Sequence, residues 1–143
     1  MEYTGNKNTV SPEELLKRAK DAASLAYAPY SRFHVGAAML FEDGEVVTGC
    51  NFENASYGLT MCAERCAIAV MVSRGMKNPI AVAVAGSHEE RDDYLSVPCP
   101  PCGACRQTFM EFNPDMRVIL ASKDGPVTFE LKELLPHSFF LEK

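Results

Sequence analysis

The sequence lacks a long apolar run, an excess of basic residues and a leader-like start. Its longest apolar runs, such as 80–85, are far shorter than the ~20 residues that span a bilayer, so no membrane partner is expected. Its 14 Lys+Arg against 19 Asp+Glu give a net charge of −5, which argues against a nucleic-acid partner. No basic stretch followed by an apolar one opens the chain, so no secretory signal is expected. We therefore expect a cytoplasmic protein.

What is present is typical of one folded domain. The chain has 143 residues, of which 47% are hydrophobic and 23% charged, so it can bury a core and is not disordered as a whole. There is no internal repeat, low-complexity tract or linker. The sequence predicts a single domain over residues 1–143.

The unusual feature is cysteine, with six residues in a chain of this size. An even number allows a disulfide framework, but the expected reducing compartment favours metal binding or catalysis. Cys50 and Cys66 stand apart and are interpreted as small buried hydrophobic residues. The other four lie in tight motifs, and the three histidines show no ligand spacing. Metal binding is therefore the leading interpretation of the cysteines.

Helical and strand patterns alternate along the chain. Ser11-Pro12 is typical of a helix start, and the helical spacing that follows continues until Pro29. Asp43-Gly44 predicts a hairpin turn. We expect strands at 35–41, 45–49, 80–85, 118–121 and 127–131, further helices at 61–73, 102–112 and 131–135, and irregular segments at 50–59 and 87–101. The predicted fold class is α/β, a three-layer α/β/α sandwich with a mixed five-stranded sheet.

Three cysteines lie where two predicted helices begin. Cys102-Gly-Ala-Cys105 opens one helix, and Cys62 opens the helix before it. Thiolates are the metal-binding form of cysteine, and a helix N-terminus lowers thiol pKa values through its free N–H groups and dipole. Three thiolates on Zn²⁺ carry a net charge of −1, which the N–H groups and Arg65 can offset.

Counting ligands separates two kinds of zinc site. A catalytic site has three protein ligands and a water, and the three cysteines supply that number. Glu64 then lies beside the open position as a proton carrier. A structural site needs a fourth ligand, and Cys66 or Cys99 are the alternatives for it. Cys99 is also open to interpretation as a loop thiol or an oxidation site.

Zinc deaminases combine a glutamate outside the coordination shell with a downstream Pro-Cys-x-x-Cys, which is the spacing found here. The match extends through five blocks: YAPYSRFHVGAA, GCNFENASYG, TMCAERCA, PPCGACRQ and ELLPHSF. Together they resemble the small, homotetrameric cytidine deaminases of pyrimidine salvage. The resemblance implies one Zn²⁺ per subunit on Cys62, Cys102 and Cys105. It makes Glu64 the proton shuttle.

The resemblance also implies roles for residues outside the cysteine motifs. Arg65 is expected to hydrogen-bond ligand thiolates and temper their charge. The substrate-binding residues are expected to be Asn51 and Glu53 at the ribose 3′-hydroxyl, Phe33 against the nucleoside, Ala55 and Tyr57 from a neighbouring subunit, and the C-terminal Phe139 over the base. The expected assembly is therefore a homotetramer with shared active sites.

The implied reaction is hydrolytic deamination of free cytidine and deoxycytidine to uridine and deoxyuridine, with zinc-activated hydroxide and release of ammonia. Three rivals are a zinc-stabilised binding module, a polynucleotide-editing deaminase and a deaminase for cytosine-nucleoside antibiotics of the blasticidin type. An intact Glu64 argues against the first rival, and the acidic chain with Cys62 at the first ligand position argues against the second. The NFEN block favours a nucleoside over the antibiotic.

Overall fold

The structure is a computed structural model that describes residues 10–143. The predicted absence of a secretory signal concerns residues 1–14, of which residues 1–9 lie outside the described residues. The elements are strands β1 (Phe33–Leu40), β2 (Val46–Cys50), β3 (Ala81–His88), β4 (Arg117–Leu120) and β5 (Val127–Glu130), helices α1 (Pro12–Ala23), α2 (Ala63–Ser73), α3 (Gly103–Phe112) and α4 (Leu131–Leu134), and the 3₁₀ turn η1 (Tyr57–Leu59).

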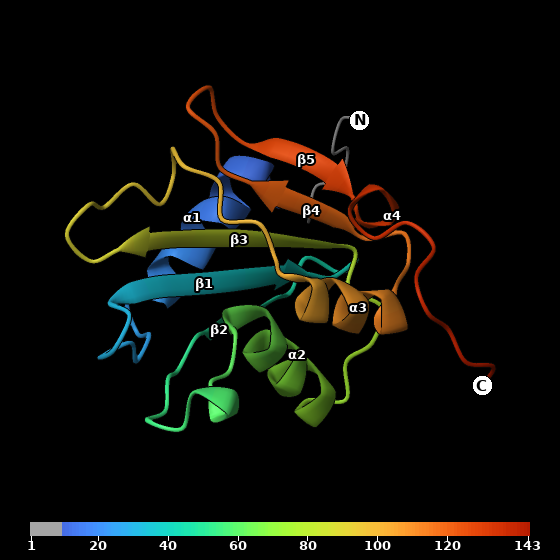
Figure 1. Cartoon of the computed structure of the whole chain (residues 1–143). Coiled ribbons are helices and arrows are strands. Elements are labelled where there is room, and N and C mark those ends of the chain that lie inside the picture. Colours follow the sequence, from blue (N-terminus) through green and yellow to red (C-terminus); the bar gives the residue numbers. More distant parts are fainter. Residues whose placement is uncertain (1–9) are drawn as a thin grey trace.

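The five strands form one mixed sheet of order β2-β1-β3-β4-β5. Only the β3–β4 pair is parallel, and the other neighbours are antiparallel. Helix α1 covers one face of the sheet, and α2 and α3 lie side by side on the other (Figure 1). This arrangement confirms the predicted three-layer α/β/α fold. No helix in residues 10–143 is long and apolar enough to cross a membrane.

Both faces of the sheet are packed closely enough to require glycine at two positions. A Cβ on Gly36 of β1 would overlap the backbone of Ala19 in α1. On the opposite side, a Cβ on Gly49 of β2 would lie 2.6 Å from the carbonyl oxygen of Ala63, the first residue of α2. The backbone of α2 is therefore fixed against the sheet close to its N-terminus, beside Cys62.

The first helix is shorter than predicted, because it ends at Ala23 rather than continuing to Pro29. Ser24 Oγ donates to the carbonyl three residues earlier at 2.6 Å, which satisfies an acceptor at the end of the helix. Beyond it, Tyr27 N donates to Asn51 O at 3.0 Å. The chain therefore leaves the helix to pair with the segment after β2, a long-range contact that helical spacing does not reveal.

Among the smaller differences from the prediction, two concern residues 87–88 and residues 50–59. Strand β3 continues to His88, where the sequence predicts a loop from residue 87, because His88 pairs with Phe33 at the start of β1. The segment 50–59, expected to be irregular, contains the single turn η1. The longer β3 holds the start of β1 in the sheet and so fixes the backbone of Phe33.

Candidate active site

Three cysteine sulfurs meet where α2 and α3 begin. Cys62 is the N-cap of α2, Cys102 is the N-cap of α3, and Cys105 lies in the first turn of α3. Their Sγ atoms all lie within 4.8 Å of one another, and those of Cys102 and Cys105 are 3.7 Å apart. Cys105 is buried and Cys102 is exposed, so one side of the cluster is open to solvent.

The electrostatics of the cluster favour the thiolate form of Cys62. The hydrogen bond from the Cys105 thiol, together with the Arg65 guanidinium, lowers the pKa of Cys62 to about 5. Arg65 Nε donates to Cys62 Sγ at 3.4 Å. The pKa of Cys105 is raised, because its proton bonds to Cys62 and because it is buried. Three sulfur donors lie beside the Arg65 guanidinium and two helix N-termini. This set fits the tetrahedral, thiolate-rich coordination that zinc prefers.

Glu64 is one of the few buried polar side chains in the described part of the chain, with 4% of its surface exposed. Burial raises the pKa of its carboxyl, and the charge of Cys62 raises it further. Its charge in turn raises the pKa of Cys105, so carboxylate and sulfurs interact. Glu64 lies in the first turn of α2, where the helix N-terminus stabilises a negative charge on its side chain. Glu64 is therefore a buried, proton-accepting group that interacts with Cys62 and Cys105 of the cluster.

Neither alternative fourth ligand joins this group. Within the described residues the sulfur cluster contains three members, without Cys66 or Cys99. Cys99 lies against β3 instead: a Cβ built on Gly86 would lie 2.6 Å from Cys99 Sγ and 2.9 Å from Phe33 Cε1. Burial raises the pKa of Cys99 to about 11, which keeps it protonated. The three-ligand interpretation is thus the one that the geometry favours.

Asn51 and Phe33 are joined by a hydrogen bond. Asn51 Nδ2 donates to Phe33 O at 3.0 Å, and Asn51 Oδ1 accepts from Val35 N at 2.9 Å. Asn51 is 9% exposed, whereas Phe33 is 38% exposed. The amide of Asn51 therefore braces the start of β1, a structural task that its position in the sequence does not reveal.

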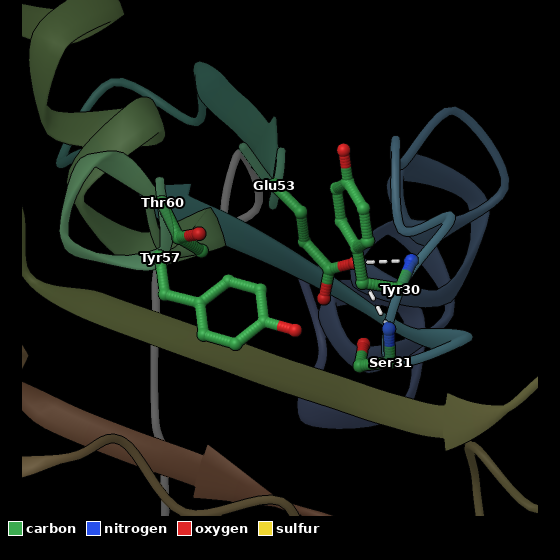
Figure 2. Close-up of a pocket in the computed structure, with 5 residues that line it drawn as sticks. All are labelled: Tyr30, Ser31, Glu53, Tyr57 and Thr60. Atoms are coloured by element: carbon green, nitrogen blue, oxygen red, sulfur yellow. Dashed lines mark hydrogen bonds between the residues drawn. The ribbon is translucent and has the colours of Figure 1, made fainter. Parts of the chain in front are cut away.

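Glu53 lies in a pocket of about 430 Å³ lined by Tyr30, Ser31, Glu53, Tyr57 and Thr60. Its Oε1 accepts from the backbone N–H groups of Tyr30 at 2.9 Å and Ser31 at 3.1 Å. Hydrogen bonds from Ser31 and Tyr30 lower the pKa of this carboxyl. Figure 2 shows the carboxylate pointing between the rings of Tyr30 and Tyr57. The pocket thus offers an ionised acceptor between two aromatic walls.

The remaining predicted substrate residues are exposed in the single chain. Tyr57 is 75% exposed and Phe139 is 68% exposed, and Ala55 is exposed as well. Tyr57 lines the pocket around Glu53, with its ring 6.1 Å from that of Tyr30, but Phe139 does not line that pocket. The chain therefore brings Glu53 and Tyr57 together but leaves Phe139 apart from them.

Sequence reasoning assigned no role to three residues that line this pocket. Tyr30 and Ser31 hold Glu53 through their backbone N–H groups, and Thr60 completes the wall. Backbone donors leave no trace in residue type. The available signal is that Tyr30 and Ser31 fall inside the YAPYSRFHVGAA block and that Thr60 opens the TMCAERCA block.

Comparison with known proteins agrees with this geometry. Residues 9–122 match the family described as "Cytidine and deoxycytidylate deaminase zinc-binding region". A cytidine deaminase from Halalkalibacterium halodurans is 46% identical over 130 residues, covering 90% of this chain and 93% of the relative. The crystal structure of cytidine deaminase from Burkholderia pseudomallei superposes with a TM-score of 0.77 at 42% identity, covering 87% and 96% of the two chains. A blasticidin-S deaminase from Bacillus cereus is 31% identical, covering 86% and 88%.

Proposed function

The chain belongs to the family of cytidine and deoxycytidylate deaminases, and from that premise we propose that the thiolate cluster, Glu64 and the pocket around Glu53 form its active site. Its reaction is zinc-dependent hydrolytic deamination: cytidine or deoxycytidine and water give uridine or deoxyuridine and ammonia. The observation that carries the assignment of the site is the meeting of Cys62, Cys102 and Cys105 beside the buried Glu64.

The metal site is Cys62, Cys102 and Cys105, and Arg65 reduces its negative charge. Zinc held there supplies a Lewis acid that lowers the pKa of water and so makes a nucleophile available near neutral pH. Arg65 donates to Cys62 Sγ, which weakens the thiolate as an electron donor without protonating it. The positive charge of Arg65 also offsets the excess negative charge of three thiolates.

Glu64 moves the protons. Its carboxylate takes a proton from the attacking water and delivers it to ring nitrogen 3 of cytosine, as water oxygen bonds to carbon 4. It then passes a second proton to the amino group, which leaves as ammonia. A group that accepts and donates in one cycle works best with a pKa near the operating pH, and the burial of Glu64 moves its pKa in that direction.

The nucleoside is held by residues of two kinds. Glu53 is an ionised acceptor suited to a ribose hydroxyl, and Asn51, whose amide braces the start of β1, supplies a second polar contact there. Phe33 packs against the nucleoside. Ala55, Tyr57 and Phe139 are exposed. Tyr57 lines the Glu53 pocket of its own chain, and the exposed faces of all three residues also act on the site of a neighbouring chain.

A site completed by a neighbour requires an oligomer, and the one we propose is a homotetramer with shared active sites. Phe139, Phe140 and Leu141 leave large apolar surfaces uncovered at the end of the chain, as does Tyr57 in η1. Contiguous exposed apolar side chains of this kind mark contact surfaces between proteins. Covering them in an assembly places Phe139 over the base bound by a neighbour.

The activity also suggests where the enzyme works. All six cysteines are free thiols, which persist in a reducing compartment such as the cytoplasm. There the enzyme supplies uridine nucleosides from free cytidine in pyrimidine salvage. The acidic chain, with its net charge of −5, has no need of a nucleic-acid partner for this reaction.

The alternative substrate, a cytosine-nucleoside antibiotic of the blasticidin type, is disfavoured. The relative that deaminates blasticidin S is 31% identical, against 46% for a cytidine deaminase. The Glu53 pocket, with its ionised acceptor, also suits a ribose hydroxyl.

The test is a substrate panel on the zinc-loaded chain. We expect one zinc per chain, and release of ammonia from cytidine and deoxycytidine at rates far above that from blasticidin S. A zinc-loaded chain that turns over none of the three, beside an active relative as control, contradicts the proposed function. Preference for blasticidin S selects the alternative.

A further inference from the structure

One side of α3 is joined to the C-terminal segment by side-chain hydrogen bonds. Arg106 Nε donates to Pro101 O at 2.8 Å, and Arg106 Nη1 donates to Leu134 O at 2.7 Å. Pro101 immediately precedes Cys102, and Leu134 is the last residue of α4. A single guanidinium therefore links the backbone beside a metal ligand to the start of the C-terminal segment.

The next residue of α3 continues the attachment. Gln107 Nε2 donates to Phe139 O at 2.9 Å. Near the end of the chain, Lys143 Nζ lies 3.2 Å from Glu111 Oε2. Figure 1 shows the segment after α4 passing beside α3 on its way to the C-terminus. Residues 134–143 thus follow α3 and are attached to it at three points.

The hydrogen bonds from Arg106 and Gln107 hold the backbone of the C-terminal segment and leave its aromatic side chains unbound. Arg106 and Gln107 donate hydrogen bonds to backbone carbonyl groups. Phe139 and Phe140, by contrast, remain largely exposed. A chain that only needed to cover its own apolar surface would turn these rings inward. Here the backbone is fixed so that the rings face outward.

We infer that Arg106 and Gln107 are positioning residues that fix the C-terminal segment to the helix bearing Cys105, so that Phe139 is presented at a defined place. The inference rests on the proposed role of Phe139 over a neighbour's substrate. It assigns to α3 a second task beside metal ligation. Loss of Gln107 leaves Phe139 in the chain but removes the anchor of its backbone, so substrate binding weakens while the proton chemistry at Glu64 is unaffected.

Two substitutions at Gln107 distinguish the effect of losing the N–H donor from the effect of changing the side chain's shape. Gln107→Leu removes the N–H donor, and Gln107→Lys retains one. We expect Gln107→Leu to raise KM for cytidine roughly 3- to 10-fold with little change in kcat, since one net hydrogen bond is lost, and Gln107→Lys to recover most of it. Thr108→Val is the matched control, because Thr108 Oγ1 donates within its own helix, to Ala104 O at 2.7 Å, and makes no side-chain hydrogen bond to residues 134–143. It should leave KM unchanged.

A double-mutant cycle with Phe139→Ala tests whether Gln107 acts through Phe139. The proposal predicts that Phe139→Ala raises KM and that adding Gln107→Leu then changes nothing more. An equal KM increase from Gln107→Leu in both backgrounds overturns it, as does no effect of Gln107→Leu where Phe139→Ala has one. If Phe139→Ala itself leaves KM unchanged, the proposed role of Phe139 is wrong, and the positioning role fails with it.

Arg106→Lys tests the link between Arg106 and Pro101, the residue before the ligand Cys102, and zinc loss gives a readout besides activity. Lysine keeps the charge, but its single ammonium replaces a planar group that donates from two nitrogens at once. We expect roughly tenfold faster zinc loss to a chelator, the order of effect seen for groups that support metal ligands, together with a raised KM. Gln107→Leu should raise KM without altering zinc loss. Wild-type zinc retention and KM in Arg106→Lys contradict the bridging role.

Discussion

The thiolate cluster and the nucleoside pocket differ in how much of each a single chain completes. The cluster draws three sulfurs and an arginine from two helix ends of one chain, with Glu64 buried beside it. The pocket offers Glu53 and Tyr57, but Tyr57 is largely exposed and Phe139 lies away from both. In the proposed function, therefore, one chain supplies the groups that carry out the chemistry, whereas recognition of the substrate depends on assembly.

This difference follows from what each task requires. Thiolates and a buried carboxylate need fixed donors at short distances, which rigid helix N-termini provide within one chain. Shielding a small substrate from water needs an apolar side chain over it. An aromatic residue from a neighbouring chain, here Phe139, supplies that apolar surface without enlarging the domain. Changes in the cluster should therefore abolish activity outright, and changes in the pocket should mostly weaken binding.

The largest effect is expected from loss of a ligand. Cys102→Ala should reduce bound zinc from one equivalent to a small fraction of it and lower turnover of cytidine to background. Metal analysis by mass spectrometry together with an ammonia-release assay measures both. Cys66→Ala is the matched control, because Cys66 lies outside the sulfur cluster, and it should retain zinc and activity. Stoichiometric zinc in Cys102→Ala would mean that another cysteine acts as the ligand.

Glu64→Gln should come next, with a loss of about 10²- to 10⁴-fold in kcat, the usual contribution of general acid–base catalysis. The amide has nearly the same size, so zinc content and the fold should be unchanged. Steady-state kinetics on protein with verified zinc content measures the effect. Turnover within a few-fold of the wild type would remove Glu64 from the proton-transfer role.

Glu53→Gln is expected to act on binding. The amide oxygen still accepts from Tyr30 N and Ser31 N, so the loop is kept, but the charge is lost. Because a charged acceptor binds a hydroxyl more strongly than a neutral one, KM should rise by about tenfold with a smaller change in kcat. Glu45→Gln, in a surface ion pair with Arg74, is the control and should leave KM unchanged. A fall in kcat with constant KM would place Glu53 in the chemistry instead.

The same carboxyl gives a dependence on pH. Its hydrogen bonds to Ser31 and Tyr30 lower its pKa from the ordinary value of 4.5, so its charged form stabilises the folded chain. That stabilisation is present above the ordinary pKa and is lost as the pH falls through the lowered pKa. Thermal unfolding midpoints should therefore fall less steeply below about pH 4.5 in Glu53→Gln than in the wild type. Parallel curves would contradict the assignment.

The smallest change in activity is expected at Gly86. An added methyl group would lie 2.6 Å from Cys99 Sγ and 2.9 Å from Phe33 Cε1. Gly86→Ala should therefore displace Phe33 and raise KM by roughly threefold, since overpacking typically costs about 1–3 kcal/mol and only part of it reaches the substrate. Adding Cys99→Ala should restore KM by making room. A Gly86→Ala chain with wild-type KM would show that the Phe33 ring position does not limit binding.

The sequence predicts the cluster better than the pocket for a physical reason. Cys62, Cys102 and Cys105 sit at helix starts, where capping residues and short spacings fix geometry locally. The strands and the hairpin turn at Gly44 were likewise predictable from period and turn chemistry, and the three-layer sheet followed from their order. A metal site of cysteine thiolates could therefore be predicted from the residues alone, whereas its assignment as catalytic rather than structural depended on the resemblance to a family.

Long-range contacts set the rest. The end of α1 depends on Tyr27 pairing with Asn51, and the brace from Asn51 to the start of β1 uses backbone partners. The packing of Cys99 against Gly86 depends equally on contacts far apart in the sequence. None of these leaves a periodic signal. The hydrogen bond from Gln107 to the C-terminal segment leaves no periodic signal either.

Mixed assemblies test directly whether the thiolate cluster with Glu64 and the Phe139 that covers the substrate come from different chains. Chains with Glu64→Gln lack the proton shuttle but carry Phe139, whereas chains with Phe139→Ala have an intact cluster but lack the cover. Unfolding and refolding the two together with zinc forms mixed assemblies, in which some intact clusters receive Phe139 from a Glu64→Gln neighbour. The account predicts a new component of cytidine turnover with the KM of the wild type, absent from either parent. Kinetics of the mixture equal to the sum of the two parents, in assemblies shown to be mixed by mass, would contradict it.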